Sequence, residues 1–329
     1  MLTTDQIKRQ SECALAQWKD QWTDHAKIHS TYEMKSLDDF KHSGFGKAMV
    51  LVGNGGSLED QMPILQKNKD NVDILACDKA LGHLIKNGIK PKFVILCDAN
   101  VDYEKYMKPF ENELKDTILI SNVCANPKWT QKDKWKDIYF FLNIDSIQSE
   151  KIFQAICPCP NLIPAATNVS GAMVVLMTQC LDQLRQNFFG YDKYLLVGFD
   201  YCFIKDKPYY AYNHDGDGKR FYMNHSQVLT QKGQYCMSSS NLIFSAKWLQ
   251  QYINIYQLPV IQCSEYTIMT GWKTGNLEKQ IQYRHKPEHA PIVQMLDRKI
   301  KQLKQELKKM DYCLQNIGKE HYSKMLATV

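Results

Sequence analysis

The sequence contains no long hydrophobic run and no strong excess of charge of either sign. No stretch approaches 18 uninterrupted apolar residues, which excludes an ordinary membrane-spanning helix. The first residues have no apolar core either, so we expect no secretory signal peptide. The formal net charge is +6, from 41 basic and 35 acidic residues, and argues only weakly for an anionic partner. We expect a cytoplasmic protein without a nucleic-acid partner, for which peripheral membrane association stays open.

Disulfide and metal frameworks are also missing. The 11 cysteines are odd in number and scattered, which is typical of a reducing compartment. Cys157-Pro158-Cys159 has no second ligand pair and does not match a zinc motif. Asp215 and Asp217 resemble the start of a calcium loop or an Asp-x-Asp motif, but Asn224 stands where a calcium loop needs glutamate. We predict a glycine-rich turn there and expect neither metal nor cofactor, with a metal at these two carboxylates as the alternative.

Short apolar runs alternate with helical segments through most of the chain. The predicted strands cover residues 49–52, 72–77, 93–97, 117–120, 138–142, 194–201 and 260–263. Strands that are apolar nearly throughout and separated by helices are typical of a parallel sheet covered on both faces. We therefore predict a Rossmann-like α/β fold with helices on both faces of the sheet.

A glycine-rich turn follows the first predicted strand and leads into a helix. It consists of Gly53, Asn54, Gly55, Gly56 and Ser57. Ser57 stands at the expected N-cap, and free backbone N–H groups in such a turn can bind an anion. The turn has neither the Gly-Lys-Ser/Thr of a P-loop nor the third glycine of a dinucleotide fingerprint. The alternative is an ordinary tight turn between strand and helix.

Small polar residues stand where other predicted strands end and where one helix begins. They are Asp78, Asp98, Asn100, Asn122 and Asp200 at the strands, with Ser170 and Gly171 at the start of a helix predicted over 167–186. The carboxyl ends of parallel strands meet at one edge of the sheet, where α/β proteins bind ligands. We predict a nucleotide or sugar pocket at this edge, although each residue alone fits a helix cap or turn.

Three further segments complete the predicted organisation. Residues 1–44 form an N-terminal helical extension, residues 45–285 the Rossmann-like domain and residues 286–329 a C-terminal heptad helix. Within the domain, residues 201–228 are too polar for a core and too aromatic for a linker, which indicates an active-site lid. The apolar seam over 296–317 fits either a coiled coil between copies or a helix packed on its own domain.

Several of these segments carry a family resemblance. Residues 52–58, 78–81 and 88–94, followed by Asp98, resemble the motility accessory factors, which are flagellin glycosyltransferases sharing a fold region with MptE-like pterin diphosphokinases. Ser170-Gly171 and residues 195–201, 210–212 and 225–226 resemble the bacterial sialyltransferases that build lipooligosaccharide. The likeness spans residues 48–275 and depends on the order of the motifs.

The resemblance implies a GT-A-like sialyltransferase variant that uses a cytidine-monophosphate (CMP) sugar, typically a nonulosonic acid, without a catalytic metal. By position, Asn54, Gly55 and Ser57 would hold phosphate and ribose, and Asp78 would stand where the family has a polar strand-end residue. Asn100 would make another nucleotide contact, and Ser170 and Gly171 would face the cytidine. Tyr210 and Tyr222 would donate hydroxyls to the departing phosphate, and His225 would be the general base. The chain departs from the pattern at Gly56, where proline is common, and at Thr167, which replaces an arginine.

Displacement of a monophosphate from a sugar requires a base for the incoming hydroxyl and donors for the leaving group. A histidine titrates near neutrality and can serve as the base, with His225 favoured and His214 its local competitor. The expected partners are a nucleotide-sugar donor and a hydroxyl of a glycan or protein. Two alternatives stay open: a pterin diphosphokinase, for which Asp98 and Asp102 offer few magnesium ligands, and a non-catalytic nucleotide-sugar scaffold.

Overall fold

The computed structural model describes residues 4–144, 147–164, 166–178, 189–207, 211 and 225–282. All of them belong to one compact unit that covers residues 1–284, and a second unit, residues 285–329, lies outside the described residues. The predicted heptad seam over 296–317 therefore lies outside the description. So do most residues of the predicted lid, namely 208–210 and 212–224.

The described strands form a parallel sheet of eight strands in the order β10-β7-β1-β2-β3-β4-β5-β6. Their bounds are β1 (Ala48–Val52), β2 (Asp73–Cys77), β3 (Phe93–Leu96), β4 (Ile118–Asn122), β5 (Asp137–Ile144), β6 (Leu162–Pro164), β7 (Lys193–Val197) and β10 (Val260–Gln262). All five residues of β1 are buried, and Val50 pairs with Ile74 on one side and Leu195 on the other. A central strand covered on both faces needs apolar residues throughout, which explains the unbroken apolar run.

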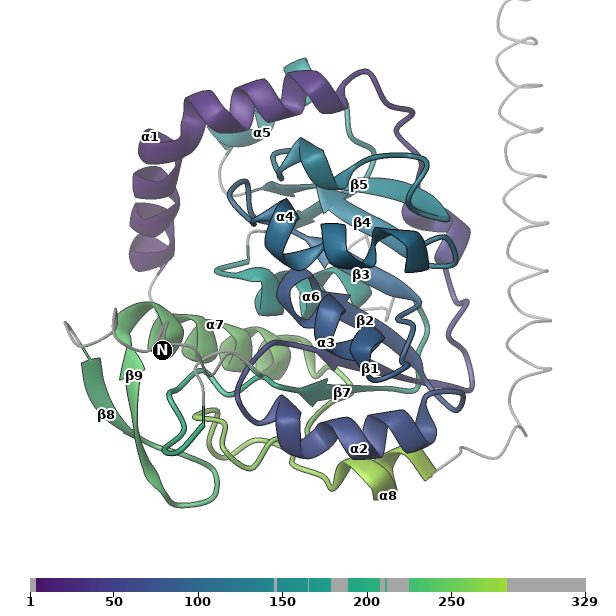
Figure 1. Ribbon diagram of the computed structural model, residues 1–329. Helices are drawn as coiled ribbons and strands as arrows, with labels where there is room; N and C mark the ends of the chain where they lie inside the picture. The colour runs from purple at the N-terminus through teal and green to yellow at the C-terminus, as the bar shows by residue number, and fades with distance from the viewer. Residues whose placement is uncertain are drawn as a thin grey trace, which may run out of the picture. The chain divides into compact units, whose positions relative to one another are not determined.

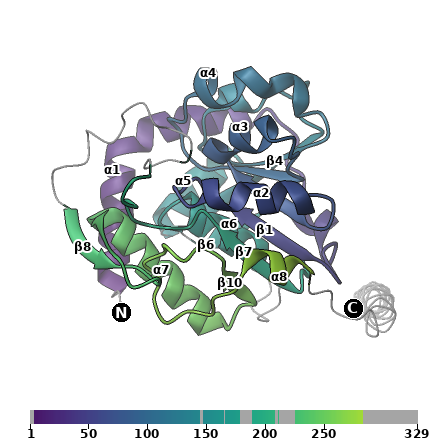
Figure 2. The same ribbon diagram turned by 60° about the horizontal axis from the view of Figure 1, so that its bottom comes forward.

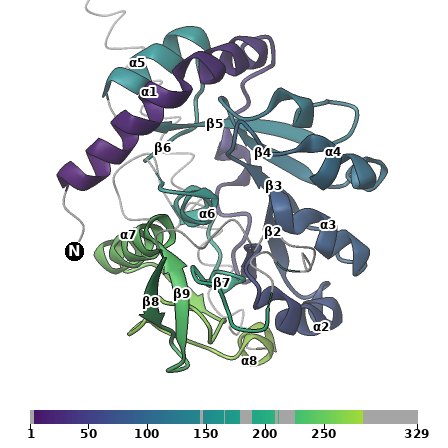
Figure 3. The ribbon, with the colours of Figure 1, turned by 60° about the vertical axis from the view of Figure 1, so that its left-hand side comes forward.

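Helices cover both faces of this sheet, as predicted (Figure 1). On one face lie α2 (Leu58–Asn68), α3 (Asp78–Lys86) and α4 (Tyr103–Tyr106); on the other lie α1 (Thr4–His29), α5 (Ile147–Ile156), α6 (Val169–Thr178) and α7 (Ser240–Tyr256) (Figure 3). Short 3-10 helices cover Leu37–Phe40, Lys108–Glu113 and Pro127–Trp129, and α8 (Leu277–Gln282) packs beside α2. The fold is thus a Rossmann-like α/β fold. No helix in the described ranges is both long and apolar enough to cross a bilayer.

The order in which successive strands are added to the sheet changes side at β1, and this change positions the site. Strands β1 to β6 add in sequence on one side, whereas β7 pairs with the other side of β1 and β10 follows it. The glycine-rich turn after β1 and the loop after β7 therefore face each other at the carboxyl edge. Such a switch point is where open α/β sheets form a ligand crevice.

A hairpin that the sequence patterns did not predict follows the incomplete lid segment. Strands β8 (His225–Leu229) and β9 (Tyr235–Ser239) pair antiparallel and lie next to α7 (Figure 2). The last four residues of the predicted lid, 225–228, belong to β8. Val228 and Cys236 pack on a small cluster with Cys202 and Ile204, separate from the main core. So few apolar residues on the inner face leave only a weak alternating signal in the sequence.

Helix α1 is anchored to the carboxyl edge of the sheet by two histidines. His29 is fully buried, and its Nδ1 donates to the carbonyl of Val123 at 2.7 Å while Nε2 lies 3.1 Å from the Thr130 hydroxyl. Burial lowers the pKa of His29 to about 4, so the ring is neutral near pH 7. One helical turn earlier, the Nδ1 of His25 hydrogen-bonds with the carbonyl of Cys124 at 3.1 Å. The helix is therefore fixed against the loop that follows β4.

Candidate functional site

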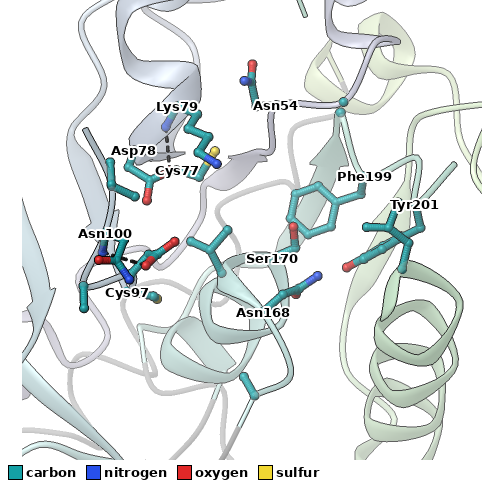
Figure 4. Close-up of a pocket in the computed structure, with 18 of the residues that line it drawn as sticks. Asn54, Cys77, Asp78, Lys79, Cys97, Asn100, Asn168, Ser170, Phe199 and Tyr201 are labelled. Carbon is teal, nitrogen blue, oxygen red and sulfur yellow. Dashed lines mark hydrogen bonds between the residues drawn. The ribbon is translucent and has the colours of Figure 1, made fainter. Parts of the chain in front are cut away.

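A cavity of about 560 Å³ opens at the switch point, a size that suits a nucleotide or a small sugar derivative. Figure 4 shows part of its lining, which comes from strand ends, the start of α6 and the loop after β7. Of the residues predicted for the site, those that line it are Asn54, Gly55, Asp78, Asp98, Asn100, Ser170 and Asp200. The structure thus brings these seven residues together around one cavity.

Other predicted residues lie elsewhere. Gly53, Gly56, Ser57, Asn122 and Gly171 do not line the cavity. The side-chain oxygen of Asn122 accepts from the backbone of Cys124 at 2.8 Å, a turn contact, and Gly171 lets α6 approach Trp248, which a Cβ would meet at 3.1 Å. These residues fit the packing and turn roles that were the simpler alternatives.

The glycine-rich turn has a different geometry from the anion site expected there. The N–H groups of Gly53 and Gly55 donate to the carbonyls of Val197 and Gly198, at 2.8 and 3.0 Å. A Cβ at Gly53 would lie 2.7 Å from the Gly198 carbonyl, so glycine is required for this close approach. The expectation of free amides at these two positions is wrong, because the neighbouring loop after β7 already occupies them.

The side-chain carboxylate of Asp200 lies at the N-terminus of α2. This carboxylate accepts hydrogen bonds from the Ser57 backbone at 2.9 Å, the Ser57 hydroxyl at 2.5 Å and the Ser264 hydroxyl at 2.6 Å. Ser57 is the N-cap residue of α2, as predicted, but its side chain makes no capping hydrogen bond to the helix. Burial raises the pKa of Asp200, and the hydrogen bonds from Ser264 and Ser57 oppose this increase. The protein's own carboxylate thus takes the place that the sequence suggested for a phosphate.

Asn54 lines the cavity and carries two unpaired polar atoms. Its side-chain nitrogen and oxygen are both buried and have no hydrogen-bond partner among the described residues. Its backbone carbonyl accepts from the N–H of Ala211 at 3.1 Å, which ties Ala211 to the glycine-rich turn. A buried amide without partners is costly, so a bound ligand with its own donor and acceptor would stabilise this residue.

A charged corner of the cavity is formed at the ends of β2 and β3. Asp78 is buried and accepts from the Lys79 backbone at 2.6 Å, while Asp98 accepts from the Asn100 backbone at 2.8 Å. Burial raises the pKa of Asp78 to about 6; Lys79 opposes this shift and Asp98 adds to it. Lys79 is the one basic residue among the described residues that line the cavity. An anionic group entering here would meet this cation.

The opposite side of the cavity carries Asn168, Ser170, Phe199 and Tyr201 (Figure 4). Asn168 accepts from the Gly171 backbone at 2.9 Å and so satisfies one donor at the start of α6. Tyr201 has a backbone φ of +58°, unusual for a non-glycine residue, and its hydroxyl is buried. Burial raises the pKa of Tyr201, so the phenol is neutral and can donate a hydrogen bond.

Of the three predicted catalytic residues, His225 alone is among the described residues. Tyr210 and Tyr222 lie outside the described residues, as do His214, Asp215 and Asp217. His225 is the first residue of β8; its ring packs edge-on against Phe203 at a centroid distance of 4.9 Å, and it does not line the cavity. Its role as general base stays a prediction.

Sequence reasoning missed several residues that line the cavity: Trp18, Trp22, Lys79, Asn143, Asn168, Phe199 and Tyr201. Lys79 directly follows a predicted site residue, and its position after a strand end was a usable signal. The two tryptophans are four residues apart in the N-terminal helix, a spacing expected of any packed helix face. Only the placement of α1 over the carboxyl edge makes them part of the site.

Comparisons with known proteins agree with this fold. The family model described as "6-hydroxymethylpterin diphosphokinase MptE-like" matches residues 21–206, more than half of the chain. The solved structure of the MAf glycosyltransferase from Magnetospirillum magneticum AMB-1 is similar in fold, with a TM-score of 0.61 and 16% sequence identity. That similarity covers 83% of this chain but only 40% of the other. A search of curated proteins found no match.

The matched region contains the glycine-rich turn, the strand-end carboxylates Asp78 and Asp98, the start of α6 and the loop after β7. It therefore includes most of the polar lining of the cavity as well as the greater part of the sheet. On the strength of this match, the chain belongs to the MptE-like family.

Proposed function

We propose that this protein is a glycosyltransferase that moves a sugar from a CMP-sugar donor to a hydroxyl of a glycan or protein, with nonulosonic acids as the class of donor sugar. The observation that carries the proposal is the Asn54 amide, buried at the switch-point cavity with both polar atoms unpaired among the described residues. Its burial favours a polar, well-fitted ligand over an apolar one. The likeness in fold to the MAf glycosyltransferase supports the reaction class.

The lining of the cavity fits the parts of such a donor. The Lys79 ammonium suits the phosphate, and the dipole of α6 adds positive potential near Ser170. Asn54, Asn168 and the Tyr201 hydroxyl supply directional contacts for a ribose or base. The aromatic face of Phe199 adds apolar surface beside them.

The chemistry requires a base and donors for the leaving phosphate. In this proposal His225 removes the proton of the acceptor hydroxyl, and Tyr210, with Tyr222 as a second candidate, donates to the departing phosphate. Neutral hydroxyl donors and helix-terminal amides can stabilise the developing negative charge without a metal ion.

Isothermal titration calorimetry with nucleotides tests the donor class. We expect CMP to bind to the wild-type chain and Asn54→Leu to abolish this binding while the protein stays folded by circular dichroism. Leucine has the same branching at Cγ as asparagine but offers no hydrogen bonds. Uridine monophosphate and ATP serve as competitors. Tight binding of either one, with no binding of CMP, would overturn the donor assignment.

A second candidate function is a pterin diphosphokinase. Two observations favour it: the description of the matching family and the presence of the Asp78 and Asp98 carboxylates in the same cavity as Lys79. Carboxylates that hold magnesium on ATP are a general feature of phosphoryl transfer. Magnesium-dependent consumption of ATP with 6-hydroxymethylpterin, lost in Asp98→Asn, would place this activity above glycosyl transfer.

A further inference from the structure

Helix α1 supplies one wall of the cavity. Trp18 and Trp22 both line it, and both side chains are half-buried. They stand four residues apart and therefore lie on the same helix face. His25 and His29 lie further along the same helix face, and their imidazoles hydrogen-bond with backbone carbonyls after β4. The wall is thus held in place by anchors outside the cavity.

Two contacts fix the tryptophan turn of the helix itself. The side-chain amide of Gln21 donates to the Asn100 side chain at 2.8 Å, joining α1 to the loop after β3. The Trp22 ring meets Phe153 of α5 edge-on, at a centroid distance of 6.3 Å. Aromatic groups that need no reordering lose little conformational entropy on binding a ligand.

This wall belongs to the Asn100 side of the cavity, opposite the contacts proposed for the ribose and base at Asn168 and Tyr201. Asn100 lies across the cavity from Phe199 and Tyr201 (Figure 4). At its side the lining combines the two indole rings with the amide of Asn100 and the carboxylate of Asp98. Aromatic faces beside hydrogen-bonding groups match a ring that is apolar on its face and polar around its rim.

We propose that Trp18 and Trp22 form a pyranose-binding subsite, a step that rests on the proposed glycosyl transfer and extends it. The axial C–H groups of a sugar ring carry slight positive charge and pack on the negative face of an indole. The equatorial hydroxyls of the ring are donors for Asp98 and Asn100 and acceptors for the amide groups. The sugar is either the transferred sugar of the donor or the first sugar of the acceptor, and both share this chemistry.

The test compares Trp18→Leu and Trp22→Leu with Trp18→Phe and Trp22→Phe. Leucine keeps apolar volume without a ring face, whereas phenylalanine keeps a ring. Ile28→Ala is the matched control, because Ile28 is an exposed residue of α1 that does not line the cavity. Affinities for CMP and for CMP-N-acetylneuraminic acid are measured by calorimetry, and thermal unfolding confirms that each variant is folded.

If the subsite holds the donor sugar, the leucine variants lower the affinity for CMP-N-acetylneuraminic acid at least tenfold and leave the affinity for CMP unchanged. The phenylalanine variants then recover part of the lost affinity. If it holds the acceptor, donor affinity is unchanged and the KM for a glycan acceptor increases while kcat stays similar. Equal losses for CMP and the CMP-sugar would overturn the subsite in favour of a base-stacking wall. Unchanged values throughout would overturn it as well.

A second measurement does not depend on the donor assignment. Saturation-transfer NMR with methyl glycosides of glucose, galactose and N-acetylneuraminic acid detects ring protons held against the wild-type protein. Transfer that disappears in Trp18→Leu supports the subsite even if CMP fails to bind, in which case only the proposed donor is wrong. Absence of transfer from every glycoside in the wild type would overturn the subsite even if CMP binds.

Discussion

The Ser57 hydroxyl donates a 2.5 Å hydrogen bond to the carboxylate of Asp200, a residue 143 positions later in the chain. This contact joins the N-cap residue of α2 to the loop after β7. It lies between two cavities, because Asp200 lines the switch-point cavity whereas Ser57 and Ser264 line a second one of about 740 Å³. The buried carboxylate therefore acts as a wall and as a cap for α2.

Asp200→Asn is expected to lower the free energy of unfolding by about 2–3 kcal/mol, the usual effect of leaving buried polar groups unpaired. Asparagine offers one acceptor oxygen, and its NH2 group would face at least one of the serine donors. Urea unfolding measures the change. Asp206→Asn, an exposed carboxylate in the same loop region, is the control and should be close to wild type. Equal stability of the two variants would contradict the structural role of Asp200.

Lys79→Met is expected to weaken CMP binding about tenfold to hundredfold, the equivalent of one hydrogen bond to a charged group. The reason is that Lys79 supplies the positive charge nearest to the carboxylate corner of the cavity. Lys105→Met is a matched control, since Lys105 also lies over the Tyr106 ring, at 5.1 Å against 6.0 Å for Lys79, but does not line the cavity. Calorimetry with CMP compares the two. Similar affinities in both variants would show that the phosphate binds elsewhere.

Asp78→Asn is expected to remove part of the pH dependence of stability. Burial raises the pKa of Asp78 from an ordinary 3.8 to about 6, so the folded state holds this proton more tightly than the unfolded state. Stability from this group is complete below about pH 4 and is lost as the pH increases to about 6. The loss amounts to about 3 kcal/mol at pH 7.

Urea unfolding of the wild type and of Asp78→Asn at pH 4 and pH 7 measures this effect. The stability of the variant relative to the wild type should increase with pH, because the amide of the variant has no proton to release. Exposed Asp70→Asn controls for the removal of a carboxylate from the chain. A wild-type curve parallel to that of Asp78→Asn over this range would show that the carboxyl is not perturbed.

The fold was predictable where a strand is buried on both faces. Unbroken apolar runs mark strands such as β1 and β7, and their alternation with helices favours a parallel sheet. Strand β6 has three residues, ends in Pro164 and lies at the edge of the sheet, so it has no such run. The β8–β9 hairpin buries too few residues to give a clear alternation.

The candidate site was predictable to the extent that it follows from parallel topology. Strand ends such as Asp78, Asp98 and Asn100 converge because all their strands point the same way. The occupant of the α2 N-terminus was not predictable, because it depends on β7 pairing with β1, a matter of sheet order. The tryptophan wall depends on how α1 crosses the sheet, which contacts of His25 and His29 decide at long range.

The last prediction concerns the proposed general base. His225→Ala is expected to lower turnover about 10²- to 10⁴-fold, the usual contribution of positioned acid–base catalysis. CMP affinity should stay near the wild-type value, because the imidazole acts on the acceptor hydroxyl and His225 does not line the cavity. Steady-state kinetics with a CMP-sugar and a glycan acceptor, together with calorimetry, separate the two effects.

The controls address the position of His225 on β8. Its ring contacts Phe203, so Phe203→Leu tests whether loss of that packing alone reduces turnover. We expect this variant and His214→Ala to keep most of the activity. If Phe203→Leu loses as much turnover as His225→Ala, the histidine acts by supporting the hairpin. If His214→Ala is inactive while His225→Ala is active, the base lies in the preceding segment, and the assignment by resemblance to the sialyltransferases fails at that point.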